Sequence, residues 1–347
     1  MTLTQLRAFV AVARLGSVKE AALSLHVSEP AVSAAVAVLR RELGDPLFVR
    51  AAGGIALTPG GRRLAAGAAE IVGLAEETRR RVREAGAGSS YLRVATTEAG
   101  AEQIVPPLLE AFVRRQPEVE ATTLAVPAGL LTELLLDRRA DVAIGIAVGA
   151  AASTTAGALP GGPGTEDAVE RVPFLRVRLV VVGSPALFGL APGGPSGSHP
   201  ASAGRPHLPL SRLRREHWLL GPGGLDPDTP GGALLARHGV GDSATSIFPS
   251  AAAALNAVAA GDGLTVTLLH LVRDELRQGK LTLLDVPGTP VDGVLYAGAL
   301  RGGRRSQAAS ALCRFVVTPP ALQGLLTRAA GVPVNHYRPT VHVTLWS

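Results

Sequence analysis

The chain has 347 residues, 47% of them hydrophobic, and a formal net charge of +6. This length and apolar content predict two or three folded domains with a sizeable core, and they exclude an intrinsically disordered chain. The single cysteine, Cys313, excludes an intrachain disulfide, suits a reducing cytoplasm and is interpreted as a small buried hydrophobe. The sequence shows no signal peptide and no apolar run long enough to cross a bilayer, so we expect a cytoplasmic protein with no membrane partner.

The pattern of residues 17–43 predicts two short helices joined by a tight turn. Ser17 and Glu20 form an S-x-x-E capping box at the start of the first helix. Ser28 is placed to cap the second helix, with Pro30 in its first turn, where the missing N–H costs nothing. This arrangement is typical of a helix-turn-helix whose second helix enters a major groove, and a helical hairpin that only packs is the alternative. Apolar residues recur along the second helix and predict an inward-facing stripe of Val32, Val36, Leu39 and Leu43.

The flanks of this segment favour the DNA-binding interpretation. An amphipathic helix is expected over residues 3–13, and two short strands, 47–50 and 55–57, are expected around a glycine turn. Three helices and a hairpin make a winged helix-turn-helix domain, which we assign to residues 1–58. Residues 1–86 hold 12 Lys or Arg against 8 Asp or Glu, so most of the net positive charge lies where phosphate binding is expected. The residues that we expect to contact DNA are Ser28, Glu29, Pro30, Ser33, Ala34, Ala37, Arg41 and Arg50.

Residues 1 to about 85 resemble the DNA-binding end of the LysR-type transcriptional regulators. The matching segments occur in the expected order, and the resemblance covers nearly the whole chain, strongly to residue 60 and more diffusely beyond it. It implies a regulator that binds double-stranded operator DNA and a small-molecule effector. It also implies a homodimer, extended to a homotetramer by pairing of effector domains. The matching segments include Gly16-Ser17-Val18, Leu25-His26-Val27-Ser28, Pro30-Ala31-Val32-Ser33, Leu47-Phe48-Val49-Arg50 and Leu57-Thr58-Pro59-Gly60.

Glu29 occupies the position after the capping serine, where this family most often has Gln. A carboxylate only accepts hydrogen bonds, so Glu29 favours a cytosine amino group and repels phosphates. Ala34 and Ala37 offer only methyl contacts to thymine. Base contacts are therefore expected to be sparse, with orientation on the duplex coming from Ser28, Ser33, Arg50 and the arginines of the linker on phosphates.

A long helix is predicted from residue 58 to about residue 84, within a linker assigned to residues 59–90. Its apolar or small residues recur at intervals of four and three, the spacing of a coiled-coil seam. A stripe of this length without a partner would be exposed, so the spacing predicts a homodimer, which the family resemblance also implies. Residues 85–90 are small and are expected to form a hinge. The seam residues are Leu64, Ala68, Ile71, Ala75, Thr78 and Val82.

Residues 91–325 alternate strand and helix patterns, which predicts a parallel sheet covered by helices on both faces. The fold class is therefore α/β, preceded by an all-α winged helix-turn-helix. The resemblance implies an effector-binding domain of two α/β lobes around a cleft, similar to periplasmic solute-binding proteins. Strands are expected at 91–96, 119–126, 141–145, 178–182, 218–220, 264–266, 281–286 and 294–300. Helices are expected at 102–115, 130–138, 232–238, 250–260, 268–278 and 307–316.

Two segments of this region are rich in small residues and proline, and we expect both, 147–170 and 189–209, to be loops. The tail, residues 326–347, departs from the family pattern. Residues 341–346 alternate like a strand, which either adds to a sheet edge or is disordered.

A ligand of an α/β domain is expected beyond the carboxyl ends of the strands. Thr96 and Thr97 are the best candidates, because hydroxyls and free amides there can hold a carboxylate; the alternative is that they cap the following helix. Glu98 beside them disfavours an anionic ligand unless it points away. The chain has only 12 aromatic residues, so a small polar or aliphatic metabolite is favoured. The effector-binding candidates are Thr96, Thr97, Pro127, Ala128, Gly145, Gly221, Phe248, Ser250, Leu264 and Thr265.

No motif points to catalysis, a metal or a cofactor. The eight histidines lack ligand spacing, the glycine-rich segments at 161–164 and 221–224 lack the Lys-Ser/Thr of a phosphate loop, and no G-x-S-x-G is present. A cytoplasmic solute-binding protein would account only for residues 91–325, and it would lack an export signal. An α/β enzyme would leave residues 1–85 unexplained. We therefore expect a regulator that is not an enzyme and binds no metal.

Overall fold

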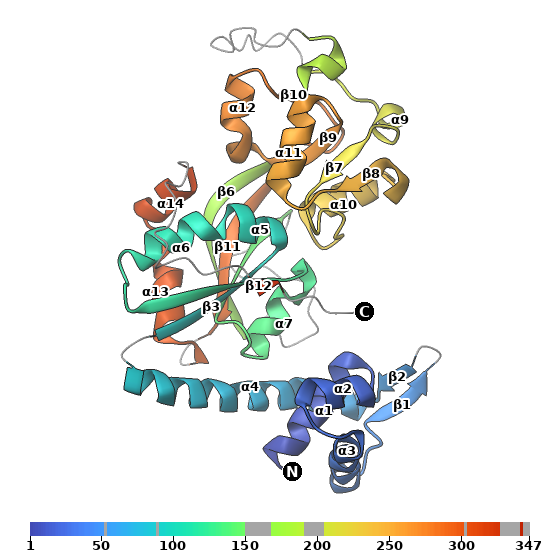
Figure 1. The fold of residues 1–347 in the computed structure, drawn as a ribbon, viewed down its shortest axis with the longest axis vertical. Coiled ribbons are helices and arrows are strands. Elements are labelled where there is room, and N and C mark those ends of the chain that lie inside the picture. Colours follow the sequence, from blue (N-terminus) through green and yellow to red (C-terminus); the bar gives the residue numbers. More distant parts are fainter. Residues whose placement is uncertain are drawn as a thin grey trace. The chain divides into compact units, whose positions relative to one another are not determined.

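The computed structural model describes residues 1–51, 54–87, 90–149, 168–190, 205–301, 304–326 and 341–342, and the side chains of residues 51, 54, 87, 341 and 342 are outside the description. The chain divides into two compact units, Met1–Gly88 with Leu136–Arg139, and Ser89–Leu135 with Ala140–Ser347 (Figure 1). Most of the two predicted loops and of the tail, and parts of the wing turn and the hinge, lie outside the described residues.

The first unit is a three-helix domain with a two-stranded wing. Its helices are α1 (Leu3–Leu15), α2 (Val18–Leu25) and α3 (Glu29–Leu43). β1 (Phe48–Ala51) and β2 (Gly54–Leu57) pair antiparallel, with Phe48 opposite Leu57. The long helix α4 (Pro59–Ala87) follows. The predicted winged helix-turn-helix is therefore confirmed, with boundaries within a few residues of those expected.

Short polar side chains start the three helices of this unit. The hydroxyls of Thr2, Ser17 and Ser28 accept hydrogen bonds from backbone amides in the first turns of α1, α2 and α3. These bonds satisfy amides that have no partner within the helix. Gly16 and Gly44 end α1 and α3 in the left-handed conformation, with φ of 63° and 66°, which favours glycine. Ser17 and Ser28 therefore cap their helices as predicted, and of the capping box expected at Ser17 the bond from the Glu20 amide to the hydroxyl is present.

The core of this unit joins α1, α3 and the wing. Leu6, Phe9, Val32, Val36 and Leu39 are buried in one hydrophobic cluster. The prediction that Leu43 continues this inward stripe was wrong, since it is 45% exposed. Leu43 is the last residue of α3, and the core covers the stripe only as far as Leu39.

The second unit is built on one sheet with the strand order β12-β4-β3-β5-β11-β6-β9-β7-β8, with β10 paired to β6. β3 pairs parallel with β4 and β5, whereas β11 pairs antiparallel with β5 and β6. The expected all-parallel sheet is therefore mixed, because the chain re-enters the sheet at β11 in the reverse direction. The strands are β3 (Ser90–Thr96), β4 (Val119–Ala125), β5 (Val142–Val148), β6 (Val169–Gly183), β7 (Trp218–Leu220), β8 (Thr245–Ile247), β9 (Leu264–Leu268), β10 (Thr282–Leu284), β11 (Val291–Leu300) and β12 (Val341–His342).

Helices pack around this sheet, as the ribbon shows (Figure 1). The single helix expected over residues 102–115 is two helices that meet at Ile104, because Pro106 lacks the N–H that a continuous helix needs. α14 was not expected. The α-helices are α5 (Glu98–Gln103), α6 (Val105–Val113), α7 (Leu131–Leu136), α9 (Leu210–Leu213), α10 (Pro230–Arg237), α11 (Ala251–Ala260), α12 (Arg273–Arg277), α13 (Gln307–Phe315) and α14 (Pro319–Leu326). The 3₁₀ helices are η1 (Ala128–Leu130), η2 (Pro185–Phe188), η3 (Asp242–Ala244) and η4 (Leu269–Val272).

The second unit has two lobes, and β6 runs from one to the other. The first half of β6 pairs with β11, and its second half pairs with β9 and β10. β6 is longer than expected, since it begins at Val169, inside the segment predicted to be a loop. The chain returns at the start of β11, where Val291 pairs with Leu179 of β6. The two crossings between the lobes are therefore neighbouring antiparallel strands.

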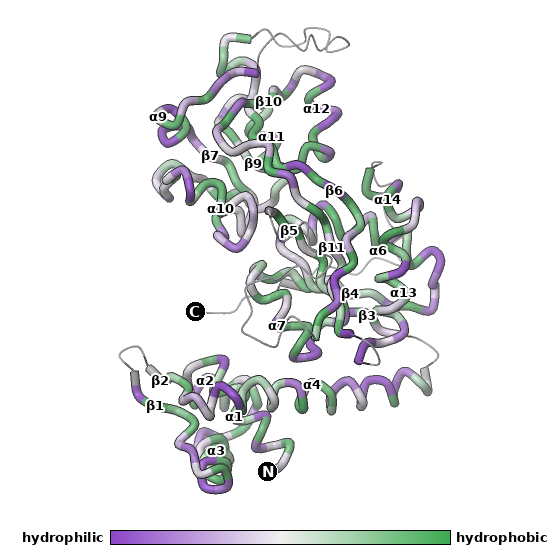
Figure 2. Tube along the Cα trace, turned by 180° about the vertical axis from the view of Figure 1, so that it is seen from behind, coloured by the Kyte–Doolittle hydropathy of each residue, from purple (hydrophilic) through white to green (hydrophobic). Residues whose placement is uncertain are grey.

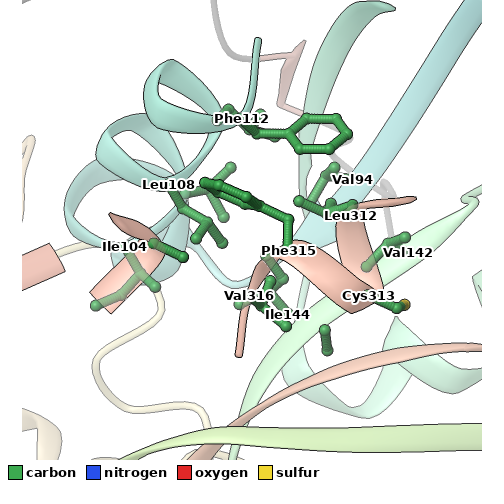
Figure 3. Packing of buried hydrophobic residues seen from close by; sticks show 14 of the residues in the cluster. Val94, Ile104, Leu108, Phe112, Val142, Ile144, Leu312, Cys313, Phe315 and Val316 are labelled. Atoms are coloured by element: carbon green, nitrogen blue, oxygen red, sulfur yellow. The ribbon is translucent and has the colours of Figure 1, made fainter. Parts of the chain in front are cut away.

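The core of the first lobe lies where α6 and α13 meet the sheet. Figure 3 shows Leu108 and Phe112 of α6 packed with Leu312 and Phe315 of α13. The rings of Phe112 and Phe315 lie 5.5 Å apart in a tilted arrangement, which suits aromatic packing. Cys313 is buried among these side chains, as predicted, and burial raises the pKa of its thiol to about 11. Separate clusters around Trp218 and around Val258 form the core of the second lobe.

β12 pairs parallel with β4 through Val341 and His342. The described part of the predicted tail strand therefore adds to the edge of the sheet. Among the described residues, no single helix has the length and apolar character needed to cross a membrane. The helices α2 and α3, which are bent by 110° relative to each other, reach that length and apolar character only when they are counted together.

Candidate nucleic-acid interface and ligand cavity

The outward face of α3 is the candidate nucleic-acid interface. All the residues predicted to contact DNA are exposed, and most of them lie on α3, which Ser28 caps by accepting a hydrogen bond from the Ala31 amide. Pro30 lies in the first turn, as predicted. A capped helix with one buried and one exposed face can enter a major groove with its N-terminal residues toward the bases. The exposed residues are Ser28, Glu29, Pro30, Ser33, Ala34, Ala37, Arg41 and Arg50.

Basic side chains flank this face. Arg41 lies in the last turn of α3, and Arg50 lies on β1. Neither forms an ion pair with any residue that the structure describes, so both guanidinium groups are available to phosphates. Arg40, which the sequence analysis did not single out, is also exposed and lies over the ring of Phe48, 5.8 Å from its centre. The contact between Arg40 and Phe48 could not be predicted from the sequence, because it forms only when the wing folds against α3.

A hydrogen-bonded cluster holds the wing to the start of α4. Asp45 Oδ1 accepts hydrogen bonds from the Leu47 amide at 2.6 Å and from the Thr58 hydroxyl at 2.7 Å. The Thr58 hydroxyl in turn accepts one from the Gly61 amide at 2.8 Å. The hydrogen bonds from Thr58 and Leu47 lower the pKa of Asp45. A Cβ at Gly60 would collide with the Asp45 carboxylate, which explains the glycine there.

The α4 face predicted to pair two subunits is exposed only in part. Ala68 is 1% exposed, because it is buried in the core of its own domain, so its assignment to a subunit seam was wrong. Leu64 packs partly against the same core. Ile71 and Val82 are 47% and 70% exposed, and the part of α4 that follows Ala75 is mostly hydrophilic (Figure 2). Helical spacing could not distinguish a face that packs on α1 from a face that packs on a second chain.

The second unit contains a cavity of about 530 Å³ between its lobes. This volume lies in the range of small-molecule sites. Residues from the carboxyl ends of β3 and β5 and from the turn after β7 line it together, as the α/β topology predicts. The predicted effector residues that line the cavity are Thr96, Thr97, Pro127, Ala128, Gly145, Gly221 and Thr265.

Three predicted effector residues lie elsewhere, so their assignment is corrected. Leu264 is fully buried in the core of the second lobe, one residue away from Thr265 on the same strand. Side chains alternate between the faces of a strand, so only one of these two can face the cavity. Phe248 packs against the cluster around Val258. Ser250 caps α11 by accepting a hydrogen bond from the Ala253 amide at 3.0 Å.

The two threonines at the end of β3 are already hydrogen-bonded. The buried Thr96 hydroxyl donates to the Ile144 carbonyl at 2.8 Å, which ties β3 to β5. The Thr97 hydroxyl accepts from the Gly100 amide at 3.3 Å and caps α5. Thr97 therefore caps the following helix, which was the alternative to a role in ligand binding. Both threonines are also part of the cavity wall.

Several polar residues of the cavity were not predicted from the sequence. Asp226 and Asp228 line it from the second lobe, together with Tyr296 from β11. The phenol of Tyr296 is buried, and burial raises its pKa, so it is neutral at physiological pH. A Cβ at Gly145 would lie 2.6 Å from the Tyr296 hydroxyl oxygen, so the glycine leaves room for the phenol. The strand pairing of Tyr296 with Gly145, which no local pattern reveals, brings them together.

Two carboxylates bridge the lobes. Glu102 of α5 accepts hydrogen bonds from the Ala251 amide at 2.7 Å and from the Ala252 amide at 2.9 Å, at the start of α11. Asp226 accepts one from the Ala128 amide at 3.0 Å, at the start of η1. Carboxylates at helix N-termini are favourably placed, because the amides there are unpaired and the helix dipole is positive.

Within the described residues, no three His, Cys, Asp or Glu side chains are grouped so that they could hold a metal ion.

Both units match known protein families. Residues 3–62 match the family model of the bacterial regulatory helix-turn-helix proteins of the lysR family, and residues 85–318 match that of the LysR substrate binding domain. An uncharacterised HTH-type transcriptional regulator of Mycobacterium tuberculosis is 37% identical over all 347 residues, covering 100% of both chains. The regulator CfxR of Cupriavidus necator is 31% identical over 318 residues, covering 90% of each chain.

A solved structure shows the same fold. The full-length OxyR of Pseudomonas aeruginosa superposes with a TM-score of 0.51 at 20% sequence identity, covering 91% of this chain and 94% of that one. The two family models, taken with the relatives, cover both the helix-turn-helix and the two-lobed unit. The chain is a DNA-binding transcriptional regulator of the LysR family, with a winged helix-turn-helix followed by a LysR substrate-binding domain.

Proposed function

We propose that α3 enters a major groove of operator DNA and that Arg41 and Arg50 contact phosphates on either side of it. The observation that carries this proposal is the exposed face of α3 with two guanidinium groups that pair with no described residue. Glu29, Ala34 and Ala37 lie on the same exposed face and supply the few base contacts. Sequence selection is thus weak per half-site and depends on the pairing of two half-sites.

A DNase I footprint of the full chain on the DNA upstream of its own gene tests this proposal. The Arg50→Ala variant is expected to weaken operator binding and to reduce the slope of log K against log salt by about one, because one phosphate contact is lost. Arg301→Ala is the matched control, since Arg301 is an exposed arginine of the second unit. Protection that is absent with the parent protein, or equal losses in both variants, would contradict the assignment.

We infer that the regulator acts as a homodimer through the exposed apolar residues of α4, and that paired effector domains extend it to a tetramer. Ile71, Leu74 and Val82 are each at least 47% exposed. They follow the three- and four-residue spacing that places side chains along one helix face. A two-fold dimer requires an operator with two inverted half-sites on one face of the duplex.

The cavity between the lobes is the proposed effector site. Its volume and its largely apolar walls suit a small molecule, and its lining comes from both lobes, so a bound molecule can change how they are held together. The relatives are transcriptional regulators by name, and the proposed role is regulatory rather than enzymatic, in the cytoplasm. The expected readout is a change in operator affinity when the cavity is filled.

A further inference from the structure

We propose that the cavity takes a small organic cation, an ammonium or guanidinium compound with an aliphatic body, rather than a carboxylate. This inference rests on the proposed effector site and specifies the chemistry of its ligand.

The charged side chains that line the cavity are all acidic. Among the described lining residues, Glu98, Asp226 and Asp228 carry the charge, and no Lys, Arg or His lines it. The Arg171 guanidinium lies over the Tyr296 ring, 5.6 Å from its centre, but Arg171 is not itself a lining residue. Between walls of low dielectric, several like charges concentrate the opposite charge. The field inside the cavity therefore favours a cation.

Caps within each lobe use one backbone amide at the start of α5 and one at the start of α10. The Thr97 hydroxyl accepts from the Gly100 amide in the first turn of α5. The Thr229 hydroxyl accepts from the Gly232 amide at 3.0 Å in the first turn of α10. Helix N-termini are ready anion sites only while their amides are unpaired. One amide in each of these two first turns is therefore already paired.

The other helix starts at the cavity are used by the bridging carboxylates. Glu102 takes the Ala251 and Ala252 amides at the start of α11, and Asp226 takes the Ala128 amide at the start of η1. An incoming carboxylate would compete with two carboxylates that the chain already supplies. An incoming cation leaves all these bonds in place.

Carboxylates from both lobes approach across the cavity. Asp228 of the second lobe lies so close to Gly129 of the first that a Cβ there would be 2.5 Å from its Oδ2. Glu98 of the first lobe lies against Gly223 of the second, 3.9 Å from the position of a Cβ. Each lobe therefore contributes a carboxylate side chain that reaches the other lobe at the cavity, and a cation bound there can attract both.

Thr265 supplies an unfilled acceptor in the wall. It lines the cavity, is 6% exposed, and its hydroxyl has no hydrogen-bond partner among the described residues. A hydroxyl oxygen accepts readily from an ammonium or guanidinium N–H. Apolar side chains around it, such as Ile144 and Leu295, suit an aliphatic body. The wall therefore combines an apolar lining with an acceptor that a cation can use.

Three four-carbon probes of matched length test the proposal on the full chain. Butane-1,4-diamine, butane-1,4-diol and succinate share a four-carbon chain and carry positive, zero and negative charge, and n-butylamine and agmatine extend the cationic set. Isothermal titration calorimetry at low salt is expected to show binding of at least one amine and no binding of succinate. Glu98→Gln and Asp228→Asn are each expected to weaken the amine on the order of tenfold, because each removes a charge-assisted partner. Thr265→Val is expected to weaken it as well.

Glu118→Gln is the matched control, since Glu118 is an exposed acid outside the cavity lining. It is expected to leave the affinity unchanged, and thermal melts establish that every variant is folded. Tighter binding of succinate than of the diamine overturns the proposal. So does a panel in which no amine binds, or amine binding that Glu98→Gln and Asp228→Asn leave intact. The operator footprint is measured in parallel: its loss counts against the proposed function, whereas an intact footprint with any of these results counts against the cation alone.

Discussion

The Thr58 hydroxyl donates a hydrogen bond to Asp45 Oδ1 at 2.7 Å, and this bond joins the turn after α3 to the residue that precedes α4. Through it, one carboxylate holds together the turn after α3, the start of the wing and the start of α4. The orientation of Arg50 on β1 relative to α3 depends on this cluster, although neither Asp45 nor Thr58 is among the residues expected to contact DNA.

Asp45→Asn is expected to lower stability at pH 7 and to remove a pH dependence. The hydrogen bonds from Thr58 and Leu47 favour the ionised carboxylate and lower its pKa in the folded protein. Its contribution is therefore complete above the ordinary pKa of about 4 and is lost as the pH falls through the lower folded value. Urea unfolding of the full chain at pH 7 and pH 3 should show a difference from the parent that shrinks in acid. A difference that stays constant contradicts this, and Asp262→Asn, at an exposed aspartate, is the control.

Ser28→Ala is expected to weaken α3 at its start and to reduce operator affinity. The substitution removes the acceptor for the Ala31 amide and should cost about 1 kcal/mol of stability. Ser28→Asn keeps a capping acceptor and should retain most of that stability, which separates the cap from a phosphate contact. Chemical denaturation and operator titration of both variants measure the two effects. Equal stability of the alanine variant and the parent would rule out the cap.

Glu29→Gln is expected to change the preferred operator sequence more than the salt dependence of binding. A carboxylate only accepts hydrogen bonds, whereas an amide both donates and accepts, so the base that it favours differs. Selection of bound sequences from a randomised half-site, together with a salt titration, measures both properties. If neither changes, Glu29 does not lie at the DNA.

Ile71→Asp and Val82→Asp are expected to dissociate the homodimer without unfolding the chain. Each would place a carboxylate without a partner in the contact between two α4 helices, at a cost of several kcal/mol of association (roughly 2–7 kcal/mol for a buried polar group). Ala68→Asp is the contrasting variant, because Ala68 is buried in its own domain and the charge should unfold that domain. Sedimentation velocity and circular dichroism distinguish the two results. An unchanged oligomer with both exposed-site variants would place the subunit contact elsewhere.

Cys313 is expected to resist alkylation in the native protein. Burial raises its pKa to about 11, so roughly one thiol in a thousand is ionised at pH 8, and the side chain is enclosed by α13 and the sheet. Mass spectrometry after iodoacetamide should show labelling in urea and almost none without it. Rapid native labelling would mean that this part of the core opens.

The sequence predicted the helix-turn-helix well because its signals are local. Ser17, Ser28 and Pro30 mark helix starts within a few residues of where the helices begin. The cavity was predicted in outline, because the carboxyl ends of parallel strands, such as Thr96 and Gly145, meet at the same edge of a sheet.

Errors arose wherever a contact joins distant segments. Ala68 follows a coiled-coil spacing, but α1 of its own chain covers it. Leu264 and Thr265 are adjacent, and only the register of β9 decides which of them lines the cavity. The bonds of Glu102 to Ala251 and Ala252 cross about 150 residues, so no window of sequence could reveal them.

The paired crossings of β6 and β11 limit how the lobes can move. These two hydrogen-bonded antiparallel strands form a ribbon between the lobes, so a movement of one lobe relative to the other has to pass through it. The register of this ribbon shifts between Leu295 and Tyr296, and both residues line the cavity. The cavity therefore lies against the ribbon at its irregular step. We expect the lobes to rotate relative to each other about the axis of this ribbon. Ligand occupancy would then change the angle between the lobes rather than the width of the cavity between them.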